Sequence, residues 1–252
     1  MTIFVPPEDI AKRTGIILSA DKARYLSSVL RRKTGDILTV IDGRGRAYAA
    51  VVSSLSKGAA AIDITGEVSL NTEPSIPLVL CQGVLKGEKM DMVVQKTTEL
   101  GVREIVPVIS ERCLVKETRK VKRWQKIAEE AAEQCGRAVV PLVREPRELL
   151  SACEEREGTG LLFWEQGGMP LREALAKVRE RRGTHGLSEA GPFPPSPLSL
   201  FVGPEGGFSR AEVERAEERG LVRTTLGKRI LRAETAALVS VALVLHLIEP
   251  DG

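Results

Sequence analysis

The sequence predicts an α/β protein with two parts, a β-rich N-terminal domain and a larger C-terminal domain built around a parallel sheet. Three observations support this prediction. Short apolar runs broken by glycine-containing turns fill much of the N-terminal part. From Leu78 onward, apolar strands alternate with amphipathic helices. Near the C-terminus, the glycine-rich loop GPEGG at 203–207 follows a fully apolar run and precedes a helix.

In the N-terminal part, strands are expected at 37–41, 47–52 and 59–64, with a turn at 42–45. Apolar runs at this spacing are typical of a small β-barrel or sandwich. We also expect a helix that begins at Asp21 as its N-cap and ends in the basic residues 31–33. The segment 71–77 has the composition of a linker.

The C-terminal part begins with a strand at 78–81 and an amphipathic helix at 88–100 that Gly101 ends. A strand at 102–109 and a helix at 121–135 follow, then a strand at 138–143, a helix to about 157 and a strand at 161–164. This alternation indicates βαβ units and a parallel sheet covered on both faces. The segment 183–197 contains four prolines and three glycines and is expected to be a flexible surface insertion. His185 lies in it and is therefore a poor catalytic candidate.

The glycine-rich loop is the strongest candidate for a ligand site. Residues 198–202 are all apolar or small, so Gly203 stands at the carboxyl end of a buried strand, where α/β sheets bind ligands. Ser209 and Glu212 have the spacing of a capping box, and the helix that follows runs to Arg219. The loop therefore joins a strand tightly to a helix and leaves its amides free to bind a ligand, although a connecting turn without a ligand is the alternative.

Known nucleotide-binding motifs do not match this loop. Its spacing is G-x-x-G-G rather than G-x-G-x-x-G, and the chain has no G-x-x-x-x-G-K-[ST]. The sequence therefore argues against NAD and against ATP as ligands.

The run 236–248 is apolar almost all round, so the helix it forms is expected to be buried on every side. It is too short to span a bilayer. Packing against a second subunit is the simplest way to bury it in a chain of 252 residues. His246 lies in this run and is expected to be a hydrogen-bonded core residue.

Overall composition is that of a soluble globular protein, with 42% hydrophobic and 28% charged residues. The net charge of +3 does not indicate a nucleic-acid partner, but seven Lys and Arg residues lie between 112 and 126, opposed only by Glu117. Such a block suits a phosphate-rich partner, and a solvated face is the alternative. Cys81, Cys113, Cys135 and Cys153 form no zinc motif and no disulfide framework. With no signal-peptide core at the N-terminus, we expect a cytoplasmic protein without a metal or a membrane partner.

Two C-terminal motifs, FVGPEGGFS and LGKRILRAETAA, resemble the SPOUT class of S-adenosylmethionine-dependent RNA methyltransferases. More narrowly, the chain resembles the RsmE family, which methylates N3 of a uridine in 16S ribosomal RNA of the small subunit. The upstream segments QGVLKGEKMDMVVQKTTELGVREIVPVISERC and RWQKIAEEAAEQCGRAVVP are similar to the same family, and VLRRKTGD with GRGRAYAAVV is similar to its PUA-like barrel.

The resemblance implies a PUA-like β-barrel RNA-binding domain at 1–72 and a SPOUT trefoil-knot methyltransferase domain at 73–252. It also implies that two copies of the chain form a homodimer. It also implies that S-adenosylmethionine binds across three loops. The candidate cofactor-binding residues are Phe163, Trp164, Glu165, Val202, Gly203, Pro204, Gly206, Gly207, Leu226, Gly227, Ile230 and Leu231. The candidate RNA-binding residues are Arg31, Arg32, Lys86, Lys89, Arg112, Lys116 and Arg123.

For catalysis, we expect Arg232 to orient the base and to offset charge on its carbonyl oxygens. Glu205 or Glu234 is a candidate for removing the N3 proton, and loop-holding is the alternative, favoured for Glu234. Two other functions stay open, namely methylation of a ribose 2′-hydroxyl and a non-catalytic role as an RNA-binding ribosome-assembly factor. The intact glycine loops argue against the second.

Overall fold

A computed structural model describes residues 2–183 and 196–249, and it divides into two compact units. The first unit comprises Met1–Glu73 and Glu129–Val140, and the second comprises Pro74–Ala128 and Pro141–Gly252. The predicted insertion at 183–197 falls almost entirely outside the described residues. None of the helices in the described part is both long and apolar enough to cross a membrane.

The first unit is a five-stranded sheet in the order β1-β3-β4-β5-β2. Its strands are β1 (Thr2–Phe4), β2 (Ile16–Leu18), β3 (Ile37–Ile41), β4 (Ala47–Leu55) and β5 (Ala60–Val68). β1 pairs with β3 in parallel, and the other pairs are antiparallel. Alternate residues such as Leu38 and Val40 face a single apolar core. The three strands predicted from the sequence are thus present.

The helical segment of this unit differs from the prediction. A short helix α1 (Pro7–Ile10) follows β1, and α2 (Ala20–Arg24) continues into a π-helical turn, η1 (Tyr25–Val29). Ser19, not Asp21, caps α2, because its hydroxyl accepts the Lys22 N–H at 3.4 Å. The helix also ends before the basic residues, since Arg31 adopts a positive φ of 51°.

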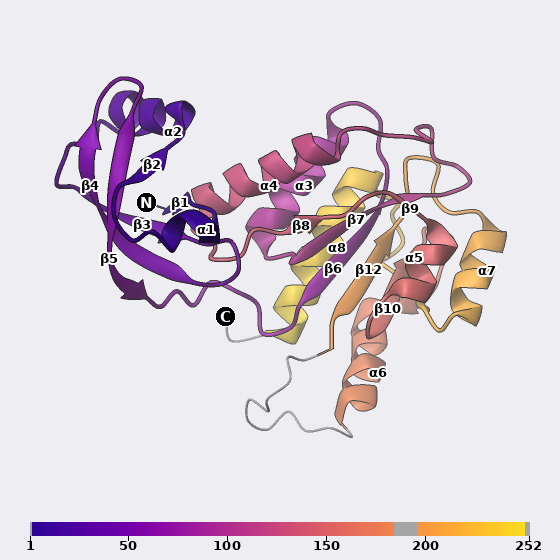
Figure 1. Cartoon of the computed structure of the whole chain (residues 1–252). Coiled ribbons are helices and arrows are strands. Elements are labelled where there is room, and N and C mark those ends of the chain that lie inside the picture. Colours follow the sequence, from indigo (N-terminus) through magenta and orange to yellow (C-terminus); the bar gives the residue numbers. More distant parts are fainter. Residues whose placement is uncertain (1, 184–195, 250–252) are drawn as a thin grey trace. The chain divides into compact units, whose positions relative to one another are not determined.

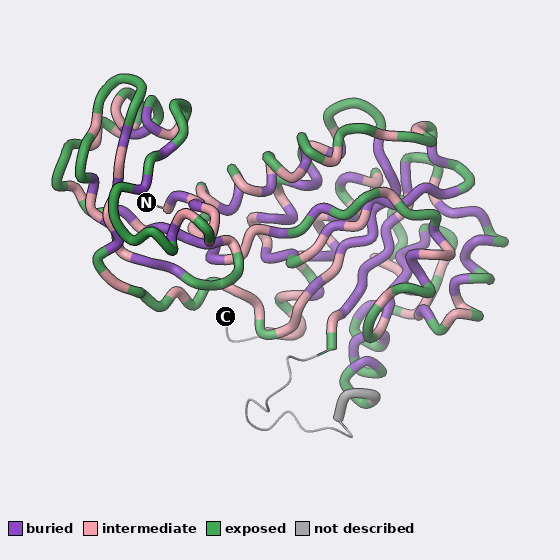
Figure 2. The backbone as a smooth tube through the Cα atoms, viewed as in Figure 1, coloured by how far each residue is buried: buried purple, intermediate pink, exposed green. Residues whose placement is uncertain are grey.

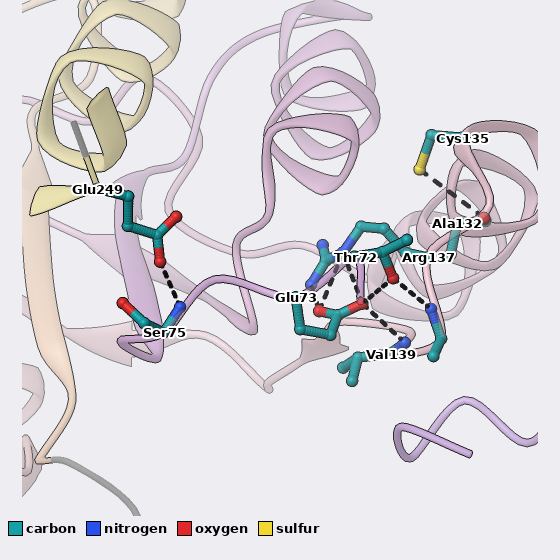
Figure 3. A network of polar contacts seen from close by, with 9 residues as sticks. Thr72, Glu73, Ser75, Ala132, Cys135, Arg137, Val139 and Glu249 are labelled. Carbon is teal, nitrogen blue, oxygen red and sulfur yellow. Dashed lines mark hydrogen bonds and ion pairs between the residues drawn. The ribbon is translucent and has the colours of Figure 1, made fainter. Parts of the chain in front are cut away.

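A polar network fastens the end of the first unit's N-terminal segment to residues 137–139 (Figure 3). The Arg137 side chain is only 4% exposed, and its guanidinium donates to Glu73 through Nη2 at 2.6 Å and through Nε at 3.2 and 3.3 Å. Glu73 also accepts the Val139 N–H at 3.2 Å. The predicted linker therefore contains a carboxylate, Glu73, that pairs with the buried Arg137. Separately, within the second unit, the Glu249 carboxylate accepts the Ser75 N–H.

The second unit is an eight-stranded parallel sheet in the order β11-β13-β10-β12-β6-β7-β8, with β9 also paired to β7. Its strands are β6 (Leu78–Gly83), β7 (Glu104–Ile109), β8 (Leu142–Val143), β9 (Arg147–Glu148), β10 (Thr159–Phe163), β11 (Met169–Pro170), β12 (Leu198–Val202) and β13 (Val222–Thr225). Its helices are α3 (Lys89–Leu100), α4 (Val121–Cys135), α5 (Leu149–Glu155), α6 (Leu171–Gly183), α7 (Arg210–Glu218) and α8 (Ala233–Ile248); the last turns of α4 belong to the first unit.

Both faces of this sheet are covered, as predicted (Figures 1 and 2). In β12, all five residues are buried, with Leu198, Leu200 and Val202 on one face and Phe201 on the other. The first face packs against α3, α6 and α8, and the second against α5 and α7. Burial of each such side chain contributes about 1.5–3 kcal/mol. β12 is thereby fixed at the centre of the sheet.

Three features of the second unit differ from the sequence prediction. The expected strand at 138–143 is reduced to Leu142–Val143, because residues 138–140 belong to the first unit, where the Val140 N–H donates to the Gly43 carbonyl at 3.0 Å, and Pro141 has no N–H to donate to a neighbouring strand. The sequence analysis did not include α6 or the short strand β13. Finally, α8 is not buried on every side within the chain, since Leu243 is 40% exposed and His246 is exposed. The prediction that His246 is a core residue is wrong for the single chain.

Candidate active site

A cavity of about 430 Å³ lies in the second unit, where β10, β12 and β13 end. Its walls are the segments that follow these three strands, together with Lys89 and the first turn of α8. The carboxyl ends of parallel strands meet at one edge of a sheet, so ligands bind there in α/β folds. The position of the cavity therefore agrees with the site predicted at Gly203.

The β12–α7 loop is held in a tight turn from both ends. The Gly207 N–H donates to the Pro204 carbonyl at 2.9 Å, and Gly207 adopts a φ of +65° that favours glycine. The predicted capping box is present: the Ser209 hydroxyl accepts the Glu212 N–H at 3.2 Å, and Glu212 accepts the Ser209 N–H at 2.8 Å. Glu212 also accepts the Glu111 N–H at 2.7 Å.

The loop lies directly against the end of β6. A Cβ atom on Gly83 would lie 2.4 Å from the Pro204 nitrogen, so only glycine fits there. The neighbouring Gln82 side chain is fully buried, and its amide donates to the carbonyls of Gly83 at 2.9 Å and Gly203 at 3.2 Å. Gln82 thus fastens the ends of β6 and β12 together. The sequence analysis did not identify it, since its role depends on contacts with residues 120 positions away.

Directly after β10, Trp164 is buried and connects this end of β10 to the β12–α7 loop and to β13. Its indole N–H donates to the Phe208 carbonyl at 3.3 Å, and its backbone N–H donates to the Thr224 carbonyl at 3.0 Å. The Arg223 guanidinium lies 5.6 Å from its ring centroid, a cation–π distance. Glu165, the next residue, is exposed at the cavity and lies beside Gly207.

The third wall is the β13–α8 loop. Ile230 is 79% exposed, an unusual position for an isoleucine. Arg232 is the N-cap residue of α8, and its side chain makes no hydrogen bond or ion pair within the described part of the chain. Its guanidinium is thus available to a ligand in the cavity.

Charged groups of both signs face this cavity. The Lys89 ammonium lies 3.5 Å from an oxygen of Glu205 and 3.7 Å from Oε2 of Glu234. Glu165, Arg229 and Arg232 complete the charged lining. Such a mixture suits a ligand that carries charge of its own next to apolar parts.

All twelve candidate cofactor-binding residues line this cavity, and so do Glu205, Arg232 and Glu234. The structure brings them together from three segments, and their individual roles remain predictions. The lining also contains Lys89, Phe208, Thr225, Arg229, Ala233 and Ala236, which the sequence analysis did not assign to this site. Phe208, Arg229, Ala233 and Ala236 lie inside the two C-terminal motifs, and Thr225 directly precedes the second, so assigning each motif as a whole would have found all of these except Lys89.

The candidate RNA-binding residues are more scattered. Lys89 lines the cavity, and Arg112 donates to the Gly206 carbonyl at 3.3 Å. Lys116 donates to the carbonyls of residues 110 and 111 at 2.9 and 2.7 Å. Arg123 pairs with Asp91 at 2.8 Å, and the hydrogen bond to this carboxylate raises the pKa of Arg123. These side chains have structural partners, so their contact with RNA remains a prediction.

The remaining candidates are Lys86, Arg31 and Arg32. Lys86 lies in the loop between β6 and α3, and its backbone N–H donates to Glu205 at 3.0 Å. Arg31 and Arg32 follow the π-helical turn in the first unit, where Arg32 lies 3.8 Å from Asp36. Among the described residues, no group of His, Cys, Asp and Glu is arranged to hold a metal ion.

Comparison with known proteins identifies the family. Residues 72–245 match the model of an RNA methyltransferase domain, and residues 18–65 match an RNA methyltransferase PUA domain. Ribosomal RNA small subunit methyltransferase E of Synechocystis sp. is 33% identical over 98% of this chain and 78% of its own length. The protein of that name from Bacillus subtilis is 30% identical over 98% of this chain and 96% of its own.

Solved structures give the same result. Ribosomal RNA small subunit methyltransferase E of Neisseria gonorrhoeae, bound to S-adenosylmethionine, matches with a TM-score of 0.83 and 32% identity, covering 98% of this chain and 97% of that one. A methyltransferase of Legionella pneumophila with the bound cofactor matches with a TM-score of 0.80 and 31% identity, at the same coverage. The fold class implied by the resemblance is therefore confirmed. This chain belongs to the ribosomal RNA small subunit methyltransferase E family of RNA methyltransferases.

Proposed function

We propose that this protein transfers a methyl group from S-adenosylmethionine to N3 of a specific uridine in 16S ribosomal RNA of the small subunit. One observation carries the proposal: every candidate cofactor residue lines a single cavity at the carboxyl ends of three parallel strands. The chain has this site in a fold that matches, at a TM-score of 0.83, a relative that binds S-adenosylmethionine.

The cavity has the size and lining that this cofactor needs. Its volume of about 430 Å³ lies within the range of small-molecule sites, which extends from about 300 to 1,000 Å³. Phe163, Leu226, Ile230 and Leu231 offer apolar surface for an adenine ring, and the glycine loop offers backbone amides. When bound, S-adenosylmethionine supplies the electrophilic methyl group. The three glutamates of the lining favour its positive charge.

Alignment of the base is the main task left to the protein. Arg232 stands at the cavity without a side-chain partner in the described part of the chain, so we assign it to the carbonyl oxygens of the uracil. There its positive charge stabilises negative charge that develops on the ring when N3 loses its proton. Glu205 and Glu234 are the candidate proton acceptors.

RNA must present an unpaired or flipped uridine, because N3 is occupied in a base pair. We propose that residues 1–72 and the basic residues 112–126 bind the RNA backbone, which makes the affinity fall with salt. Two copies of the chain are proposed to pair through the uncovered side of α8, where Leu243 is exposed. The enzyme is proposed to act in the cytoplasm, where ribosomes assemble.

The test is methyl transfer from labelled S-adenosylmethionine to 16S ribosomal RNA, or to small subunits, that lack the modification. The unchanged protein is expected to label the RNA, and Arg232→Ala is expected to lower turnover by about 10²-fold or more while the cofactor dissociation constant is retained. Arg210→Ala removes an exposed arginine of α7 outside the cavity and is the matched control. Cofactor binding without any transfer to either RNA would contradict the proposed substrate.

A further inference from the structure

Two carboxylates in the cavity are candidates for the same proton. Glu205 follows β12, Glu234 begins α8, and both lie near the ammonium of Lys89, at 3.5 and 3.7 Å. Lys89 is the first residue of α3, so the three side chains come from three separate elements. The contacts that each carboxylate makes distinguish their roles.

Glu205 has a structural partner. Its Oε1 accepts the backbone N–H of Lys86 at 3.0 Å, which ties the β12–α7 loop to the loop between β6 and α3. A carboxylate that accepts a hydrogen bond from a backbone N–H holds two chain segments together. The contact assigns loop-holding to Glu205, whereas the sequence analysis had favoured that role for Glu234.

Glu234 differs from Glu205 in its burial and in its hydrogen-bond partners. The residue is 8% exposed, and its Oε2 is shielded from solvent and accepts no hydrogen bond from any residue that the structure describes. The Lys89 ammonium, at 3.7 Å, is beyond hydrogen-bonding distance and contributes charge only. A buried acceptor without a donor is unfavourable, so this carboxylate is set to accept a hydrogen from a ligand.

The charges around Glu234 indicate which kind of ligand supplies that hydrogen. Lys89 faces it from α3, Glu165 and Glu205 follow β10 and β12, and Arg229 and Arg232 precede α8. An ammonium donor at Glu234 Oε2 would lie close to the Lys89 ammonium, which is 3.7 Å from the same oxygen, and would be repelled by it. A neutral N–H group meets no such repulsion.

We infer that Glu234 takes the N3 proton of the target uridine. This inference rests on the proposed function. N3 forms a bond to the methyl carbon as the carbon–sulfur bond breaks, and that bond's electron pair stays on sulfur. The N3 proton passes to the Glu234 carboxylate, which later releases it to water. The positive charge on sulfur and the negative charge on the carboxylate are lost together, so the net charge of the site does not change.

The test compares Glu234→Gln, Glu205→Gln and Glu218→Gln. Glu218 is an exposed glutamate of α7 outside the cavity and serves as the control. Glu234→Gln is expected to lower turnover by about 10²–10⁴-fold, as for loss of a general base, while the cofactor dissociation constant and the thermal unfolding midpoint are retained. Glu205→Gln is expected to weaken cofactor binding instead.

A second substrate separates proton removal from a structural role. In 16S ribosomal RNA transcribed with 5-fluorouridine, the fluorine lowers the pKa of N3, so less base catalysis is needed. Turnover by Glu234→Gln is expected to be at least about tenfold higher with this RNA than with the ordinary RNA, and also to rise at high pH. Turnover by Glu205→Gln is expected to show neither increase.

Three results would overturn the inference: full turnover of Glu234→Gln, loss of cofactor binding in that variant, or an equal defect with both RNAs. Each of these presupposes that the unchanged protein forms 3-methyluridine. If the unchanged protein forms none, the proposed function fails, and the two failures are thus distinguishable.

Discussion

Adding a single methyl group at Gly83 is expected to displace the glycine-rich loop. The Cβ atom of Gly83→Ala would lie 2.4 Å from the nitrogen and 2.6 Å from Cδ of Pro204, and 2.8 Å from the carbonyl carbon of Gly203. Ordinary contacts begin at 3.4 Å, so Pro204 must retreat by about 1 Å. Two of these three atoms are backbone atoms, so no side-chain rotation relieves the contact.

The displacement affects stability and cofactor binding to different extents. Overpacking of this kind typically costs about 1–3 kcal/mol of unfolding free energy. Because Gly203, Pro204 and Gly207 line the cavity, a shift of about 1 Å is also expected to weaken S-adenosylmethionine binding by at least about tenfold and turnover by about 10²-fold.

Isothermal titration calorimetry with S-adenosylmethionine and thermal unfolding measure the two effects. Gly58→Ala is the matched control, because a Cβ at Gly58 meets no atom within 4 Å and its φ is not in the left-handed region. The control is expected to bind the cofactor normally. If Gly83→Ala bound the cofactor as tightly as the unchanged protein, the close approach of β6 and the loop would not position the site.

Three further predictions concern stability and assembly. Glu73→Ala removes the carboxylate that accepts from the buried Arg137 guanidinium at 2.6 Å and is expected to lower the unfolding free energy by about 1–3 kcal/mol in urea titrations; an unchanged unfolding free energy would contradict this. Burial raises the pKa of the Cys153 thiol from 9.0 to about 11, so this thiol ionises at lower pH in the unfolded chain than in the folded protein. The unfolding free energy is therefore expected to fall as the pH rises from 9.0 to about 11, and to fall less steeply in Cys153→Ala. An equal pH dependence of the unfolding free energy in both proteins would refute the role given to Cys153. Leu243→Arg is expected to convert a dimer into monomers in sedimentation velocity, and a monomeric unchanged protein would exclude the proposed interface.

Elements with strong local signals were predicted well from the sequence. The helix at Val121–Cys135 has the bounds predicted for it, and β12 has those of its apolar run. The capping box at Ser209 also formed as expected. In each case the signal lies within the element or directly at its ends.

Elements without such signals were missed or misplaced. β13 contains Arg223, Thr224 and Thr225, so its sequence does not show that Thr224 is fully buried between two neighbouring strands. The π-helical turn after α2 depends on packing of Leu26 in the core of the first unit. Tertiary contacts, rather than local preference, decide both.

The residues of the site also divide into those that local sequence patterns predict and those whose roles depend on distant contacts. Its glycine loops could be found from the sequence, because a glycine after a buried strand is a local pattern. The separate roles of Glu205 and Glu234 could not, since they depend on the Lys86 N–H and the Lys89 ammonium, which lie more than 100 positions away in the chain. Sequence spacing gives no distance between such residues.

The central claim is that the methyl group goes to N3 of a uridine. The most direct measurement is mass spectrometry of nucleosides from 16S ribosomal RNA that has been treated with the protein and labelled S-adenosylmethionine. The account predicts that the label is recovered in 3-methyluridine and that Arg232→Ala lowers the rate of its formation by about 10²-fold or more. Label on a ribose 2′-hydroxyl, or on any base other than uracil, would contradict the account.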